Sequence, residues 1–235
     1  MDRWEITLLD KKEIASDTFL FIFSRPDNFS FFPGQYIRIF HPLHGERIFR
    51  DFTISSIPLK NDNLECIIKD GISEYKKMLF SLPLGTKIQI QAPMGKFYFP
   101  DRDTFSHVFI AGGVGIAPFY SMLTYFGTTK RTIPITLFAS FSSPQESIYL
   151  DELQKLAKQL PDFRLVISFT QNSSASWQGE VGRITSAMIQ KYIANSSERT
   201  WWIAGAPSFV ADMEQMVRKI HVPLEQIKTD IFLGY

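Results

Sequence analysis

Cysteine is almost absent from this sequence, because Cys66 is the only one among 235 residues. A single cysteine excludes an intramolecular disulfide, and it excludes an iron–sulfur cluster whose cysteine ligands all come from these residues. Since Cys66 lies in a strand-like run, we expect it to be a small buried hydrophobic side chain and not a nucleophile.

An excess of charge is also missing: 25 Lys and Arg residues face 24 Asp and Glu residues, and the formal net charge is +1. No basic run stands out, which argues against nucleic acid or an anionic membrane surface as a partner. The first residues, MDRWEITLLDKKE, lack the apolar core and cleavage site of a signal peptide. These absences predict a soluble cytoplasmic protein with no membrane span.

The histidines do not predict a metal site. His41 and His44 lie three residues apart with no third ligand nearby in the sequence, and His107 and His221 are isolated. A protein zinc site needs three or four such ligands. We therefore expect no bound metal.

The first hundred residues read as a β domain. They are rich in Ile, Phe, Thr and Tyr, and Gly and Pro divide them into short runs. Alternation of apolar and polar residues is typical of half-buried strands, and regular spacing of such runs predicts an antiparallel barrel or sandwich. One helix is expected at 73–82, and strands are expected at 17–24, 36–40, 51–55, 63–69 and 87–92.

The pattern changes after a charged, proline-containing link at 98–106. Apolar runs then alternate with helical segments, which predicts βαβ units and a parallel sheet covered on both faces. Two domains are therefore expected, 1–100 and 101–235. In the second, the expected strands are 107–111, 133–140, 163–169 and 200–204, and the expected helices are 117–126, 148–159, 185–193 and 208–219.

The run 107–126 has the length of a membrane span and no charged side chain apart from His107. Its centre, however, holds three glycines and Pro118. A strand that ends at Ala111, a glycine turn, and a helix with proline in its first turn explain every one of these residues. Glycines let the backbone approach a ligand, and a helix N-terminus favours phosphate. The alternative is a tight turn without a ligand.

Several further stretches accompany this turn. They are 33-PGQY-36, 50-RDFTISS-56, 92-APMGKF-97, 202-WIAGAPSF-209 and 228-KTDIFLGY-235. Each is a modest signal alone, but in this order and spacing they resemble the ferredoxin–NADP reductase superfamily of flavoproteins over essentially the whole chain. The resemblance implies an N-terminal antiparallel β-barrel that binds FAD and a C-terminal α/β domain that binds NADH or NADPH.

The resemblance assigns FAD contacts to the first domain. It implies that Arg50 offers its fork of donors to the pyrophosphate, that Phe52 lies against the isoalloxazine in place of the family's tyrosine, and that Thr53 bonds flavin N5. Counting forward from the turn places the phosphate-binding hydroxyl at Ser73, whereas counting back from 79, 82 and 85 places Lys76 there. The expected FAD-binding residues are Arg50, Phe52, Thr53, Ile68, Lys69 and Ser73.

The resemblance assigns coenzyme contacts to the second domain. The late turn has Ala204 where many relatives have a cysteine. Phe232, or alternatively Tyr235, would cover the isoalloxazine, and Asp230 would orient the reacting ring. The expected catalytic residues are Thr53, Asp230 and Phe232, and the expected cofactor-binding residues of this domain are Gly112, Gly113, Val114, Gly115, Pro118, Gly205, Pro207 and Tyr235.

The implied activity is hydride transfer from NADH or NADPH to FAD across the inter-domain cleft, followed by electron transfer to an acceptor. That acceptor stays open among a ferredoxin, a flavodoxin, an oxygenase component and a small molecule. One alternative is a flavin reductase that uses free flavin as its substrate. Another is a non-catalytic flavoprotein subunit, against which the intact turn at 112–118 argues. The stretch 140-SFSSPQESIY-149 has no basic residue and one acid, Glu146, which favours NADH.

Overall fold

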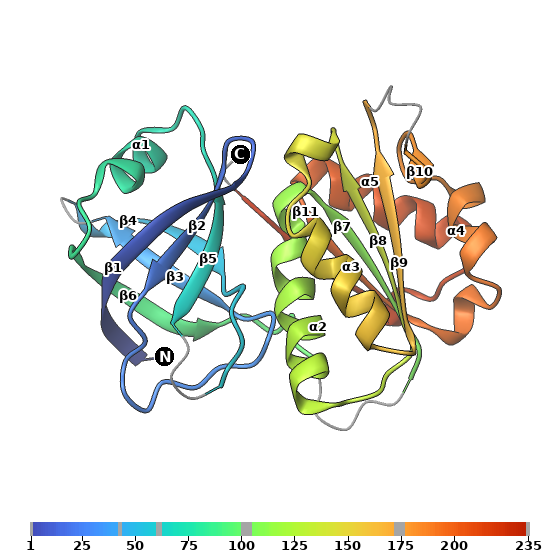
Figure 1. Cartoon of the computed structure of the whole chain (residues 1–235), viewed down its shortest axis with the longest axis horizontal. Helices are drawn as coiled ribbons and strands as arrows, with labels where there is room; N and C mark the ends of the chain where they lie inside the picture. The colour runs from blue at the N-terminus through green and yellow to red at the C-terminus, as the bar shows by residue number, and fades with distance from the viewer. Residues whose placement is uncertain (1, 42–43, 60–62, 100–104, 172–176, 234–235) are drawn as a thin grey trace. The chain divides into compact units, whose positions relative to one another are not determined.

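The computed structural model describes residues 2–41, 44–59, 63–99, 105–171 and 177–233. The chain separates into two compact units, one built on Met1–Phe99 with Ala117–Tyr125 and the other on Pro100–Ile116 with Phe126–Leu233 (Figure 1). Within the described ranges, every helix is too short or too polar to reach across a lipid bilayer. Part of the expected link at 98–106 lies outside these ranges, and so does Tyr235.

The first unit is an antiparallel β structure, as predicted. Six strands pair in the order β4-β3-β6-β1-β2-β5. The two edge strands meet, because Ile54 forms an antiparallel bridge with Cys66 and the Ser55 amide donates to the Glu65 carbonyl at 2.8 Å. This closes the sheet into a barrel. The strands are β1 Asp2–Ala15, β2 Thr18–Phe23, β3 Tyr36–His41, β4 Gly45–Thr53, β5 Leu64–Lys69 and β6 Lys87–Met94.

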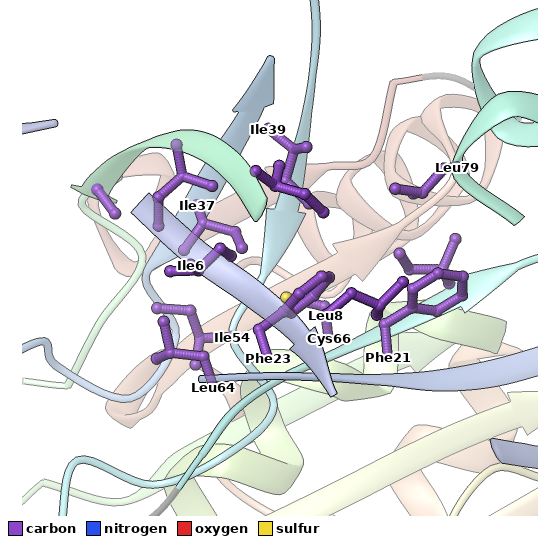
Figure 2. Packing of buried hydrophobic residues seen from close by; sticks show 14 of the residues in the cluster. Ile6, Leu8, Phe21, Phe23, Ile37, Ile39, Ile54, Leu64, Cys66 and Leu79 are labelled. Carbon is purple, nitrogen blue, oxygen red and sulfur yellow. The ribbon is translucent and has the colours of Figure 1, made fainter. Parts of the chain in front are cut away.

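The barrel interior is filled by the apolar side chains that alternate with polar ones along the strands. Figure 2 shows these side chains converging from several strands, with Leu79 added by helix α1 (Glu74–Ser81). Cys66 is fully buried among them, and burial raises the pKa of its thiol, as expected for an inert hydrophobic side chain. The labelled core residues are Ile6, Leu8, Phe21, Phe23, Ile37, Ile39, Ile54, Leu64, Cys66 and Leu79.

The second unit is a parallel sheet with helices, also as predicted. Six strands pair in the order β10-β9-β8-β7-β11-β12, and every pairing is parallel. The strands are β7 His107–Gly112, β8 Ile135–Phe141, β9 Phe163–Phe169, β10 Glu180–Val181, β11 Thr200–Gly205 and β12 Ile227–Ile231. The 3₁₀ turn η1 is Gly113–Ile116, and the helices of this unit are α3 Leu150–Gln159, α4 Ser186–Tyr192 and α5 Pro207–Lys219. Helix α2, Ala117–Thr129, follows η1 directly, and its residues Ala117–Tyr125 group with the first unit.

Both faces of this sheet are buried, which explains its long apolar runs. Every residue of β8 is buried. Helices α4 and α5 pack against one set of alternate strand residues, including Ile110 and Ile203, while α3 contacts β9 (Figure 1). The run 107–126 is therefore divided among a strand, a 3₁₀ turn and a helix, as the sequence predicted.

Candidate functional site

The expected flavin motif lies on β4 of the barrel. Strand alternation places Arg50 and Phe52 on one face, opposite Ile39 and Ile37 of β3, and Asp51 and Thr53 on the other face. Thr53 is the last residue of β4. A ligand that passes around the end of this strand can therefore contact both Phe52 and Thr53, although their side chains leave the strand in opposite directions.

Tyr75 of α1 holds that helix against the motif. Its buried hydroxyl donates to the Ile39 carbonyl at 2.8 Å, and burial raises the pKa of this hydroxyl, so it stays a protonated donor. Its ring centroid lies 5.4 Å from the Arg50 guanidinium carbon and 6.4 Å from the Phe52 ring centroid, with the two rings inclined by 29°. Sequence reasoning missed Tyr75, although an aromatic four residues before Leu79 on the same helical face was a usable signal.

Asp51, the variable position of the motif, forms an ion pair with Arg38 of the neighbouring strand β3. Its two carboxylate oxygens accept from Nε and Nη2 of Arg38 at 2.8 and 2.9 Å. The Arg38 guanidinium also lies 3.8 Å from the Phe49 ring centroid. This cross-strand pair joins β3 to β4 beside the motif and leaves the Arg50 side chain exposed, with Nη1 donating to the Phe49 carbonyl at 2.8 Å.

The turn between β5 and α1 brings both candidate phosphate-binding side chains together. Ser73 caps α1, because its Oγ accepts from the Lys76 amide at 3.3 Å. The Lys76 side chain folds back over Gly71, where an added Cβ would lie 3.1 Å from Cδ and 3.3 Å from Nζ. Lys69 is the last residue of β5. Ile68 points into the barrel core, so only its main-chain atoms can face a cofactor.

The glycine turn begins directly at the end of β7 and leads into α2. Gly113 has a φ of +54°, a left-handed conformation that favours glycine, and nothing lies within 4 Å of its ideal Cβ position. Val114 is buried, and Pro118 sits in the first turn of α2, where its missing N–H is harmless. Gly113 is thus the point at which this turn presents bare backbone to open space.

The other glycines are required by the protein's own packing. A Cβ on Gly112 would lie 2.8 Å from the Phe209 ring, and one on Gly205 would lie 3.0 Å from it. A Cβ on Gly115 would lie 2.2 Å from the Ala204 carbonyl oxygen. The sequence analysis left open a tight turn without a ligand, but it did not identify Phe209, whose signal was an aromatic residue two positions after Pro207.

The C-terminal signature lies beside this turn. Strand β12 pairs with β11 so that Asp230 is opposite Ala204, and the Phe232 amide donates to the Gly205 carbonyl at 2.9 Å. Pro207 begins α5 at the same end of β11. Ile231, the last residue of β12, is 48% exposed, so this end of the strand is not covered by the core. Tyr235 lies outside the described residues.

This end of the sheet is a topological switch point. From β7 the sheet continues through β8 and β9 on one side and through β11 and β12 on the other. Ligands of such sheets bind outside the carboxyl ends of the strands where the order reverses. The open turn at Gly113, together with Gly205, Asp230 and Phe232, lies at this end, so the residues present fit a dinucleotide. On β4, the cation of Arg50, the ring of Phe52 and the hydroxyl of Thr53 follow one another, and these groups fit a flavin dinucleotide.

Two of the four histidines lie next to each other in the first unit. The ring centroids of His41 and His44 are 4.6 Å apart with the rings tilted by 44°, and the His44 amide donates to His41 Nδ1 at 3.3 Å. Across the described ranges, no group of three or more His, Cys, Asp or Glu side chains is positioned to hold a metal ion.

Comparisons with known proteins match each unit separately. The oxidoreductase FAD-binding domain family matches residues 5–99, and the oxidoreductase NAD-binding domain family matches residues 109–217. The glycine betaine monooxygenase reductase subunit of Chromohalobacter salexigens is 28% identical over 86% of this chain and 56% of its own length. The propane 2-monooxygenase reductase component of Mycolicibacterium smegmatis is 27% identical over 88% and 60%.

Solved structures share the fold over almost the whole chain. An Amycolatopsis cytochrome P450 reductase has a TM-score of 0.85 at 19% identity, covering 98% of this chain and 70% of that one. A ferredoxin NADP⁺ reductase from Neisseria gonorrhoeae with bound FAD and NADP has a TM-score of 0.82 at 24% identity, covering 98% and 99%. The present chain spans less than two thirds of the two curated relatives. The chain therefore belongs to the oxidoreductases that join an FAD-binding domain to an NAD-binding domain, and it has the fold of the ferredoxin–NADP reductases.

Proposed function

We propose that this protein is an NAD(P)H-dependent flavoprotein reductase that passes hydride from NAD(P)H to FAD and electrons onward to an acceptor. The observation that carries the proposal is the gathering of the expected coenzyme residues at the switch point of the parallel sheet, in a chain whose other domain is of the FAD-binding family. Residues 1–100 would form the FAD domain and 101–235 the NAD(P) domain. The cytoplasmic location expected from the sequence belongs to the same proposal, and cell fractionation tests it.

The chain's own residues would hold and orient the cofactors. Arg50, exposed beside Tyr75, is free of the ion pair that occupies Asp51 and would bind the FAD pyrophosphate. Phe52 would lie against the isoalloxazine, and Thr53 at the strand end would exchange a hydrogen bond with its N5. Bound FAD would supply the redox chemistry, which the protein scaffold lacks.

The remaining site residues would serve the nicotinamide coenzyme. Gly113 and the first turn of α2 would face its phosphates, because both left-handed glycine backbone and a helix start favour anions. The carboxylate of Asp230 would orient the reacting ring. Phe232, fastened to Gly205 by its amide, would close the site from the C-terminal side.

The acceptor proposed first is an oxygenase component. Its support is the set of relatives, two of which are reductase parts of monooxygenase systems. A ferredoxin or flavodoxin is the second choice. Because these residues contain one cysteine, an iron–sulfur acceptor would have to lie outside them.

An anaerobic titration of the purified protein with NADH and NADPH tests the function. A yellow protein whose flavin absorbance bleaches on addition of coenzyme supports the proposal. A colourless protein that reduces added flavin identifies a flavin reductase instead, and a yellow protein that ignores both coenzymes identifies a non-catalytic subunit.

The Arg50 assignment has a matched control on the same strand. Arg50→Ala is expected to weaken FAD binding by about 10- to 100-fold, since a hydrogen bond to a charged group contributes about 1.5–3 kcal/mol. Arg47→Ala removes another exposed β4 arginine and is expected to keep wild-type FAD affinity. Equal FAD retention by the two variants after dialysis would contradict the role of Arg50.

A further inference from the structure

We propose that Ser121 of α2 is a positioning residue for hydride transfer, and that it acts through a hydrogen bond to the segment that follows the flavin motif. This inference rests on the proposed function and deepens it, because it adds a residue that acts without touching either cofactor. In that reaction a hydride leaves C4 of the nicotinamide and adds to N5 of the flavin, so the coenzyme is oxidised as the flavin is reduced. The rate of such a step depends on how the two reacting rings are held.

The hydrogen bond of Ser121 is the first observation. Its side chain is fully buried, and its Oγ donates to the Ser56 carbonyl at 2.5 Å. A serine inside a helix usually points to solvent or bonds to a carbonyl one turn back in the same helix. Here the hydroxyl instead joins α2 to a residue that lies 65 positions earlier in the chain.

The two segments that this bond joins are the second observation. Ser56 follows Thr53, the end of β4, by three residues, and its Oγ accepts from the Glu65 amide at 3.2 Å. The Ser55 amide donates to the Glu65 carbonyl at 2.8 Å, so this segment is also fixed to β5. Ser121 lies in the second turn of α2, and α2 follows the glycine turn directly in the chain. One hydrogen bond therefore connects the helix after the glycine turn with the segment after the flavin motif.

The packing of α2 on the barrel is the third observation. Phe119 and Phe97 meet edge to face, with ring centroids 5.8 Å apart and ring planes at 65°. Met122 reaches Gly34, where an added Cβ would lie 2.5 Å from its Cε. Gly34 thus leaves the room that Met122 occupies, and residues Ala117–Tyr125 group with the barrel.

The apolar contacts and the hydrogen bond constrain α2 differently. Burial of Phe119 and Met122 holds the helix on the barrel, but the hydrophobic effect is non-directional and tolerates a small slide or rotation. A hydrogen bond weakens steeply when its angle departs from linearity, so the Ser121 bond fixes the rotation and height of α2. Misplacing reacting groups by about 1 Å can slow a reaction about 100-fold. We therefore assign the attachment of α2 to its apolar contacts and its fine position to Ser121.

The test compares Ser121→Ala with Ser55→Ala, as FAD-loaded proteins, by anaerobic rapid mixing with the coenzyme that the wild type uses. Ser55 is a matched control, because its side chain is also fully buried and its Oγ donates to a backbone carbonyl, that of Glu65, at 3.1 Å. Ser121→Ala is expected to lower the limiting rate of flavin reduction about 10-fold, with FAD content and coenzyme Kd unchanged. Ser55→Ala is expected to keep the wild-type limiting rate. Ser121→Cys, whose thiol is a weak donor, is expected to fall between Ser121→Ala and the wild type.

Two further measurements separate positioning from a general loss of stability. Coenzyme deuterated at C4 is expected to show a primary isotope effect in Ser121→Ala, which identifies hydride transfer as the slowed step. The long-wavelength absorbance of the complex between flavin and nicotinamide is expected to weaken in Ser121→Ala, because it depends on how closely the rings overlap. Ser55→Ala is expected to keep that absorbance even if its Tm falls as much.

A wild-type limiting rate in Ser121→Ala overturns the inference, and so does an equal fall of the rate in Ser55→Ala. A slower reaction that is accounted for by lost FAD or a raised coenzyme Kd also overturns it, because Ser121 would then support binding. If circular dichroism shows that Ser121→Ala is unfolded, Ser121→Cys decides, and a wild-type rate in that variant refutes the positioning role. A wild-type flavin that neither NADH nor NADPH reduces contradicts the proposed function itself.

Discussion

Replacing Gly112 with alanine tests whether the glycine turn is dictated by protein packing. Gly112 ends β7, and its φ lies outside the left-handed region, so alanine meets no backbone strain there. The new methyl group would lie 2.8–2.9 Å from three atoms of the Phe209 ring. Non-bonded carbons ordinarily approach only to about 3.5–4.0 Å. The ring or the strand must therefore move.

The cost follows from how little room the ring has. Phe209 packs against the core formed by α4, α5 and the sheet, whose members include Val210 and Met213. Adding a methyl group to a packed region of this kind costs about 1–3 kcal/mol. We expect Gly112→Ala to lower the free energy of unfolding by about 2 kcal/mol, which lowers Tm by about 4–8 °C for a protein of this size.

A double-mutant cycle with Phe209→Leu isolates the clash. Urea unfolding of the wild type, the two single variants and the double variant is expected to show that leucine at 209 recovers at least about 1 kcal/mol of the Gly112→Ala cost. Gly115→Ala is the control, because its methyl group would meet the Ala204 carbonyl oxygen, a backbone atom that Phe209→Leu leaves in place. Full stability of Gly112→Ala, or an equal cost in both backgrounds, would refute the packing argument.

The remaining predictions concern the coenzyme and the C-terminus. NADH is expected to have the higher kcat/KM, because the loop after β8 carries Glu146, whose Oε2 accepts from Ser142 Oγ at 3.3 Å, and no basic side chain; a clear preference for NADPH would overturn this. Phe232→Ser is expected to change the flavin spectrum, tighten nicotinamide binding and slow flavin reduction, and rapid-mixing traces and a spectrum identical to wild type would remove Phe232 from the mechanism. Gly113→Asn is expected to keep Tm within a few degrees, since asparagine tolerates a left-handed φ and its Cβ meets open space, but to raise KM for the coenzyme about tenfold or more; an unchanged KM would contradict close approach of the coenzyme to this turn.

Local patterns were sufficient for most of the fold. The alternation in 87–91 and the apolar runs of the second half recur as β6 and as the buried parallel strands, because each pattern matches the burial of its own strand. Strand β1 was not among the expected strands. Its signal was present, since Trp4, Ile6 and Leu8 alternate with polar residues and Ile6 and Leu8 are fully buried. Arg3 and Glu5 lie on the other side of the strand, and charged residues at both ends of β1 obscured the alternation.

Candidate site residues could be proposed from the sequence only where one short stretch contains its own signal. Arg50, Phe52 and Thr53 lie within four consecutive residues, and the turn after β7 is equally short. The sequence analysis missed Tyr75 and Phe209 because both matter through long-range contacts. Tyr75 contacts β4, and Phe209 contacts Gly112 and Gly205. No sequence window contains both partners of such a contact, so the packing that supports a motif remains invisible until the chain is folded.

Because packing requires most of these glycines, their presence alone is weak support for coenzyme binding. An intact turn argues for coenzyme binding only if the protein would otherwise have no use for its glycines. Gly112, Gly115 and Gly205 do have such a use, because a side chain at any of them would collide with Phe209 or with the backbone at Ala204. A subunit that had lost its coenzyme would still retain these three. Gly113 differs, since asparagine could satisfy its φ of +54° and open space surrounds its Cβ position. Glycine at this position is the part of the motif that coenzyme binding explains and packing does not.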